Sequence, residues 1–246
     1  MKCLYRKNVG AIIDRIKRIF CRTTTSLERN KRTEHYAEYT LNDGTVLRNV
    51  EAGIYSNTGF MEFRLGEVSE IKMPHNGDSV RLEAGTLIEI LAGNRYIHHI
   101  KLKDIEEFIM THSPTGETIF VNQLSFFLGS NSVCSTWAAK NGPLIAEDSS
   151  IGRLEGIFVS YTKNGNLEMV IFPPEKNLLL YGLELKNVHA VVFDKPLRVY
   201  VDGQIFCNGQ DISDKFELQS DGQRIVRFNY AGKALNARDE VIYFRH

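Results

Sequence analysis

GIFVSYTKNGNLEMVIF, residues 156–172, is the stretch that decides the fold class. Two runs of strand-forming residues flank Asn164-Gly165, a dipeptide typical of a two-residue type I′ turn in which both central residues have φ > 0. With that loop, the predicted pairs are Thr162–Leu167, Tyr161–Glu168, Val159–Val170 and Ile157–Phe172. Toward the open end both faces of the hairpin are apolar, which predicts that it is buried on both sides.

Weaker copies of this hairpin unit recur from about residue 35 onward. Short runs of strand-forming residues are separated by glycine turns, often with Asn or Asp before the glycine. The turns recur at a drifting period of about 20 residues, the length of two strands and two connections. The pattern predicts an all-β, mainly antiparallel body of successive hairpins, as an extended repeat sheet or as a sandwich or barrel closed on itself.

Two segments depart from this rhythm. Residues 103–111, KDIEEFIMT, place apolar residues at helical spacing behind Asp104, which fits one short helix or a strand with an irregular start. In residues 172–187 a double proline precedes NLLLYGLEL, which we expect to form one strand that is buried on both faces.

Composition excludes several classes of protein. The chain has 246 residues, of which 43% are hydrophobic and 24% charged, enough for a large core and too apolar for wholesale disorder. No apolar run approaches the roughly 20 residues of a membrane-spanning helix, and charges interrupt the one segment that resembles a signal peptide. The four cysteines are scattered and fit no zinc spacing, so we expect reduced thiols and a cytoplasmic protein.

The charge is distributed unevenly between two predicted parts. Residues 1–32 hold ten Lys/Arg against two acidic residues, a net charge of +8, and residues 33–246 hold 20 against 28, a net charge of −8. Residues 4–22 carry an apolar stripe at helical spacing. We therefore predict a basic amphipathic helix and linker over 1–32, followed by an all-β repeat-like domain over 33–246.

The amphipathic helix has two leading interpretations. It lies on an anionic membrane, which would make the protein peripheral to that membrane, or it packs its stripe on the β body or another protein. Nucleic acid is disfavoured because the acidic body would repel phosphate. The candidate membrane- or partner-binding residues are Arg15, Ile16, Lys17, Arg18, Ile19, Phe20 and Arg22.

Motifs for catalysis, metals or cofactors are missing from the sequence. His98 and His99 are adjacent, but neighbouring side chains of a strand point to opposite faces and would not share one metal ion. Cys134 with His112 or His189 is a conceivable nucleophile and base, although the spacing favours a structural cysteine. We expect no catalytic residue, no metal and no cofactor.

A carbohydrate site is the alternative that the residues leave open. A glycosidase needs two facing carboxylates, and aromatic rings form sugar-binding platforms. The carboxylate candidates are Glu67, Glu70, Asp104, Glu106, Glu107, Asp194 and Asp214. The aromatic candidates are Tyr96, Trp137, Tyr161 and Tyr181.

Three segments, 160–167, 200–205 and 218–223, share a strand, an Asn-Gly or Asp-Gly turn, and a second strand or its beginning. This unit resembles the β-hairpin repeats of MORN-like proteins and covers roughly residues 36–246, without the paired glycines and Tyr/Trp spacing of those repeats. The resemblance implies a scaffold or membrane-proximal role and no catalytic residues. The predicted function is thus a non-catalytic binding or scaffold protein, and the alternative is a carbohydrate-binding or carbohydrate-active β protein.

Overall fold

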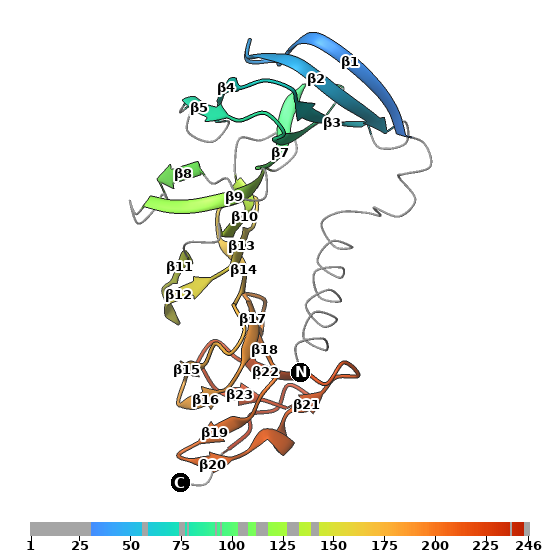
Figure 1. The fold of residues 1–246 in the computed structure, drawn as a ribbon. Coiled ribbons are helices and arrows are strands. Elements are labelled where there is room, and N and C mark those ends of the chain that lie inside the picture. Colours follow the sequence, from blue (N-terminus) through green and yellow to red (C-terminus); the bar gives the residue numbers. More distant parts are fainter. Residues whose placement is uncertain are drawn as a thin grey trace. The chain divides into compact units, whose positions relative to one another are not determined.

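The computed structural model describes an all-β chain whose strands pair antiparallel (Figure 1). The described residues are 31–55, 59–73, 77, 79–91, 93, 95–102, 108–111, 118–126, 133–138, 143–236 and 238–243. They confirm the predicted all-β, antiparallel class. The predicted N-terminal helix and its seven candidate residues lie outside these ranges. Within the described part of the chain, no helix is long and apolar enough to cross a membrane.

The chain divides into two compact units. The first comprises residues 1–72 and 81–97, and the second comprises 73–80 and 98–246. The strands that begin before residue 98 are β1 (Lys31–Thr40), β2 (Val46–Tyr55), β3 (Phe60–Leu65), β4 (Ser69–Lys72), β5 (Ser79–Leu82), β6 (Leu87–Leu91) and β7 (Tyr96–Lys101).

The first unit is organised around strands ordered β1-β2-β3-β6-β7. Alternate residues of β3 and β6 are buried, as expected for strands with one face on a core. Phe63 of β3 is central, because Tyr39 of β1 packs on its ring with centroids 4.6 Å apart. The buried side chains are Leu47, Val50, Ala52, Met61, Phe63, Leu65, Ile88 and Ile90.

The second unit contains the remaining strands. They are β8 (Phe108–Thr111), β9 (Thr118–Phe126), β10 (Val133–Ala138), β11 (Leu144–Asp148), β12 (Gly152–Gly156), β13 (Phe158–Tyr161), β14 (Leu167–Ile171), β15 (Leu178–Leu180), β16 (Leu183–Leu185), β17 (Val188–Val192), β18 (Leu197–Val201), β19 (Ile205–Cys207), β20 (Gln210–Asp211), β21 (Glu217–Leu218), β22 (Arg224–Phe228) and β23 (Ala234–Leu235), with one 3-10 turn, η2 (Ser213–Lys215). The main strand order is β7-β9-β10-β13-β14-β17-β18-β22-β21.

One buried residue from each of eight strands forms a continuous row across this sheet. Each member lies directly opposite the next in the strand register, and each is at most 3% exposed. Because side chains alternate between faces, this row fixes which face of every strand is inward. The row consists of Ile100, Leu124, Thr136, Val159, Val170, Val191, Val199 and Val226.

Smaller β elements complete the second unit. The hairpin of β11 and β12 lies against β9, β13 and β14, and its Leu144, Ala146 and Leu154 are buried. A second sheet, ordered β15-β16-β19-β20, buries further leucine and isoleucine side chains. The ring of Tyr181, between β15 and β16, packs on Phe228 of β22 with centroids 5.1 Å apart. These smaller elements therefore add buried side chains to the core of the second unit.

The 156–172 hairpin is confirmed, but its predicted turn type is wrong. Val159 pairs with Val170, and side chains on both faces are buried, as predicted. Of Asn164 and Gly165, only Gly165 has positive φ, and the N–H of Thr162 donates to the carbonyl of Asn166. This is a three-residue loop closed by a left-handed glycine. The bulge it introduces pairs Tyr161 with Leu167, so the predicted pairs Tyr161–Glu168 and Thr162–Leu167 are wrong.

The same hydrogen-bond pattern closes other turns. The first residue donates its N–H to the carbonyl of the fifth, and the fourth donates to the carbonyl of the first. Thr162 adds a side-chain contact, because its Oγ1 accepts the N–H of Asn166 at 3.2 Å. The turns that share the backbone pattern span 41–45, 162–166, 219–223, 229–233 and 236–240.

The two irregular segments have different outcomes. In 103–111, the described residues 108–111 form strand β8, which fits the second of the two predicted alternatives. The single strand predicted in NLLLYGLEL is wrong. Tyr181 and Gly182, both with positive φ, divide it into β15 and β16, and Leu179 is 73% exposed. The leucines are therefore not buried on both faces as predicted. The turn between them was missed because neither Asn nor Pro marks it.

Candidate functional site

Five hairpin connections of the second unit converge on one groove of about 730 Å3, here called the turn groove. This volume lies within the range of sites that bind small ligands. In an antiparallel sheet, alternate connections lie at the same end, which brings together the turns after β13, β17 and β22. The lining residues are 147–150, 165–167, 193–197 and 228–230 with Tyr181, Leu235 and Asp239.

Two exposed tyrosines provide the flat surfaces of the turn groove. Tyr181 is 41% exposed and Tyr230 is 83% exposed. Tyr181 is held from behind by Phe228, and the ammonium of Lys195 lies 5.5 Å from the centroid of the Tyr230 ring. Such cation–π contacts orient an otherwise mobile ring. Aromatic rings that remain exposed form platforms for the apolar face of a ligand.

Hydrogen-bonding groups surround the two rings. The side-chain oxygen of Asn229 accepts the N–H groups of Ala231 and Lys233, each at 3.0 Å, which shapes the β22–β23 turn. Asn166 and Ser149 also line the groove, in the turns after β13 and β11. Short polar side chains in turns are typical of loops that bind ligands on a rigid scaffold.

The carboxylates of the turn groove are mostly held by the protein itself. Asp148 accepts the N–H of Ser150 at 2.8 Å and that of Ile151 at 3.3 Å. Asp194 forms an ion pair with Arg198, and Asp239 forms one with Arg227. Glu147 is the fourth carboxylate of the lining, and Lys195 is the cation. The groove therefore combines aromatic surfaces with polar groups whose charges are largely compensated.

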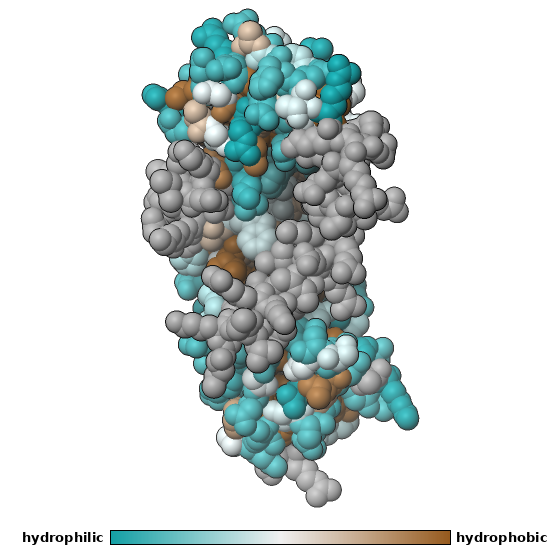
Figure 2. Space-filling view, turned by 45° about the vertical axis from the view of Figure 1, so that its right-hand side comes forward, coloured by the Kyte–Doolittle hydropathy of each residue, from teal (hydrophilic) through white to brown (hydrophobic). Residues whose placement is uncertain are grey.

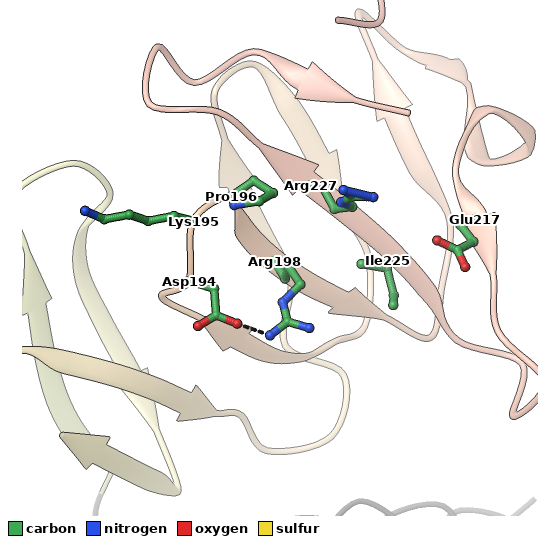
Figure 3. Close-up of a pocket in the computed structure, with 7 residues that line it drawn as sticks. All are labelled: Asp194, Lys195, Pro196, Arg198, Glu217, Ile225 and Arg227. Atoms are coloured by element: carbon green, nitrogen blue, oxygen red, sulfur yellow. Dashed lines mark hydrogen bonds and ion pairs between the residues drawn. The ribbon is translucent and has the colours of Figure 1, made fainter. Parts of the chain in front are cut away.

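A second recess, of about 430 Å3, adjoins the turn groove and is here called the arginine recess. It shares residues 194–196 with the turn groove and is otherwise lined by Arg198, Glu217, Ile225 and Arg227 (Figure 3). Glu217 also borders a third recess of about 380 Å3, whose lining includes Asp214. The three hollows thus follow one another along the C-terminal strands.

The sequence-predicted residues are divided among these features. Of the aromatic candidates, Tyr181 lines the turn groove, whereas Trp137 packs on Phe158 and Tyr96 lies on β7. Tyr161, the fourth aromatic candidate, lies on β13, and burial raises the pKa of its hydroxyl to about 12. Of the carboxylate candidates, Asp194 lines the turn groove and the arginine recess. Glu67 and Glu70 belong to the first unit, and residues 104, 106 and 107 lie outside the described ranges.

The histidine and cysteine candidates form no shared site among the residues described. No group of three His, Cys, Asp or Glu side chains that could hold a metal is found there. Cys134 lies on β10, and two intervening strands separate it from β17, which carries His189. His99 Nδ1 lies 2.7 Å from Ser125 Oγ on the neighbouring strand. Burial is the largest cause that lowers the pKa of His99, to about 4, so this imidazole is neutral at pH 7.

Sequence reasoning missed the residues of the turns. Tyr230, Asn229 and Lys195 line the turn groove, but no strand pattern singles them out. The usable signal was the position of the connections, because every second turn of an antiparallel meander lies at the same end. On the face shown in Figure 2, hydrophilic residues dominate the described surface and hydrophobic residues form small patches.

No protein-family model, curated protein or solved structure matches this chain. The resemblance to MORN-like repeats therefore stays a prediction. What the fold and the site define is an antiparallel β protein with a groove built from hairpin turns.

Proposed function

We propose that this protein is a non-catalytic carbohydrate-binding protein whose ligand lies in the turn groove. The observation that carries the proposal is the pair of exposed rings, Tyr181 and Tyr230, set among amide, hydroxyl and carboxylate groups in one groove. The groove volume of about 730 Å3 has room for a short oligosaccharide segment.

Carbohydrate matches both halves of this surface. A pyranose ring has an apolar C–H face, which stacks on an aromatic side chain, and a rim of hydroxyl groups that both donate and accept hydrogen bonds. Asn166, Asn229 and Asp194 are suitable partners for such hydroxyls.

The same contacts favour binding over hydrolysis. A glycosidase needs one carboxylic acid and one carboxylate placed on either side of the scissile bond. Here Asp148 is bound to the backbone of its own turn, and Asp194 and Asp239 are held in ion pairs. These carboxylates are engaged in structural contacts that a catalytic step would have to break.

The test is binding of the full chain to an array of defined oligosaccharides, followed by calorimetry with the best ligand. Tyr230→Ala is expected to weaken that binding about tenfold or more, because it removes one stacking surface. Tyr243→Ala is the matched control, since Tyr243 is 79% exposed and does not line the groove. Absence of binding to any printed glycan, or equal loss in both variants, would contradict the proposal.

A second candidate function is that of a scaffold at a membrane surface, supported by the sequence of residues 4–22. Their apolar stripe and flanking Arg15, Lys17, Arg18 and Arg22 have the composition of a helix that lies on anionic lipid. The competing interpretation, in which the stripe packs on protein, needs no lipid. Carbohydrate binding and membrane attachment use different parts of the chain and are compatible.

A further inference from the structure

We propose that the oligosaccharide bound in the turn groove carries an acidic group, a carboxylate or a sulfate, and that Arg198 and Arg227 bind this group in the arginine recess. The proposal rests on the carbohydrate function of the turn groove and adds the chemical class of its ligand. The acid group would project from the turn groove past residues 194–196, which border both hollows.

The two arginines form a pair by strand register. Arg198 of β18 lies directly opposite Arg227 of β22, so their side chains leave the same face of the sheet. Figure 3 shows the two side chains on adjacent strands, with Asp194 reaching the guanidinium of Arg198. Ile225, two residues before Arg227, gives the recess an apolar wall. Two guanidinium groups beside an apolar wall form a site for the oxygens of one carboxylate or sulfate group.

Carboxylates of the protein hold both arginines in place. Asp194, in the turn before β18, pairs with Arg198, and Asp239, in the turn after β23, pairs with Arg227. Both arginine side chains are half-buried, which limits their rotamer freedom before any ligand arrives. A preorganised site loses less conformational entropy on binding.

An anion between these arginines also offsets an unfavourable contact. Like charges directly opposite each other in an antiparallel pair destabilise the sheet. The ion pairs with Asp194 and Asp239 compensate each charge individually, and an acidic ligand group would contact both. Lys195 borders both hollows, but its side chain extends away from Arg198 and Arg227 in Figure 3 and its ammonium lies 5.5 Å from the centroid of the Tyr230 ring.

The experiment compares acidic and neutral forms of the same oligosaccharides with the full chain. Each oligosaccharide is printed on an array in a neutral, a uronate-bearing and a sulfated form. Calorimetry then measures the affinities of the three forms of the oligosaccharide that binds best. We expect the acidic form to bind about tenfold or more tightly than its neutral counterpart, as for a hydrogen-bonded charge pair. The uronate and sulfate arms show which acid the recess accepts.

Arg198→Gln and Arg227→Gln are each expected to remove the advantage of the acidic form and leave affinity for the neutral form nearly unchanged. Arg153→Gln is the control, since Arg153 is a surface arginine of β12 that lines neither hollow. A measurement on the unaltered chain gives a second readout. Raising the salt concentration should weaken binding of the acidic form much more than binding of the neutral form.

The outcomes separate the two proposals. If neutral and acidic forms bind equally and with equal salt dependence, the acidic-ligand inference is overturned and the carbohydrate function stands. If the acidic advantage survives in both glutamine variants, the arginine recess is not its source and the inference is again overturned. If no printed oligosaccharide binds, both proposals fail together.

Discussion

Gly232 and Tyr181 are in contact so close that a side chain on the glycine would displace the ring. A Cβ atom at Gly232 would lie 2.3 Å from Cδ1 of Tyr181, and Gly232 has a φ of +70°. The β22–β23 turn therefore supports one of the two rings of the turn groove by having no side chain at this position.

Replacing Gly232 with alanine tests this support. We expect Gly232→Ala to lower the free energy of unfolding through left-handed strain, about 1–2 kcal/mol, with a further loss from the displaced ring. Gly222→Ala is the matched control. Gly222 occupies the same place in an equivalent five-residue turn with a φ of +87° and has nothing within 4 Å. Denaturant unfolding should show the larger loss in Gly232→Ala, and equal losses would show that Tyr181 moves freely.

The raised pKa of Glu89 leads us to expect that the stability of the first unit depends on pH. Burial, and then the charge of Glu62 directly opposite on β3, raise its pKa to about 7. In the unfolded chain the group ionises near its ordinary value of 4.5, so folding takes up a proton between about pH 4.5 and 7. The contribution of Glu89 to the free energy of unfolding is fully present below pH 4.5 and is lost as the pH rises through 7. This loss is at most about 3 kcal/mol.

Glu89→Gln should therefore stabilise the first unit at pH 8 and change little at pH 4.5. Amide hydrogen exchange in β3 and β6 measures the stability of this unit separately from that of the second unit. Glu51→Gln is the control, because Glu51 is an exposed residue of β2. A variant that behaves like the unaltered chain at both pH values would show that Glu89 ionises normally in the folded state.

His99 predicts the opposite pH dependence for the second unit. Its pKa is lowered from 6.5 to about 4 by burial, with smaller effects of His98 and Lys101. As the pH falls, the unfolded chain binds this proton before the folded chain does. The contribution of His99 to the free energy of unfolding is therefore fully present above pH 6.5 and falls by up to about 3 kcal/mol as the pH drops toward 4. His99→Gln should flatten the pH dependence of amide exchange in β9 and β10, and an unchanged slope would contradict the assignment.

Ser213 joins η2 to β19 through its side chain. Its Oγ accepts the backbone N–H of Ile205 at 2.9 Å in a buried setting and donates to Asp211 at 2.5 Å. Ser213→Ala leaves that buried N–H without its acceptor, which costs about 1–3 kcal/mol of unfolding free energy. Ser220→Ala, at an exposed turn position, should have almost no effect on the denaturation midpoint. Similar midpoints for both variants would mean that another group replaces Ser213.

The N-terminal segment predicts association with anionic lipid. The full chain should sediment with vesicles that contain phosphatidylserine and remain in solution with neutral vesicles, and deletion of residues 1–32 should abolish sedimentation. Because β1 begins at Lys31, reversing Arg15, Lys17, Arg18 and Arg22 to glutamate is a second variant that leaves the strand intact. If the full chain does not sediment with either vesicle, the membrane hypothesis fails.

The sequence predicts the strands far better than the site. Val159 and Val170 could be paired in advance because a period of two and one marked turn determine their register. Asn164 misled the turn assignment, because an Asn-Gly pair fits both the type I′ turn and the three-residue loop. At Tyr181 a turn was missed altogether, because this residue adopts positive φ in a two-residue turn that contains neither Asn nor Asp.

The turn groove was beyond sequence reasoning for a physical reason. Tyr230 and Lys195 are 35 positions apart in the chain, and they meet because β17–β18 and β22–β23 close at the same end of the sheet. A pattern read along one strand carries no information about such contacts. Pairing of β18 with β22 skips three intervening strands, and nothing local in the sequence indicates that choice.

The residues of the buried row from Ile100 to Val226, which define the inward face of the strands, are different from the residues that line the turn groove. Each strand supplies one residue to that row, whereas the turn groove is built mainly from the connections. Substitutions that keep the length and backbone conformation of each turn therefore leave the register of the strands unchanged. A chain of this design can acquire a new ligand by exchanging a few turn residues, in the way that antibody loops diversify on a constant framework.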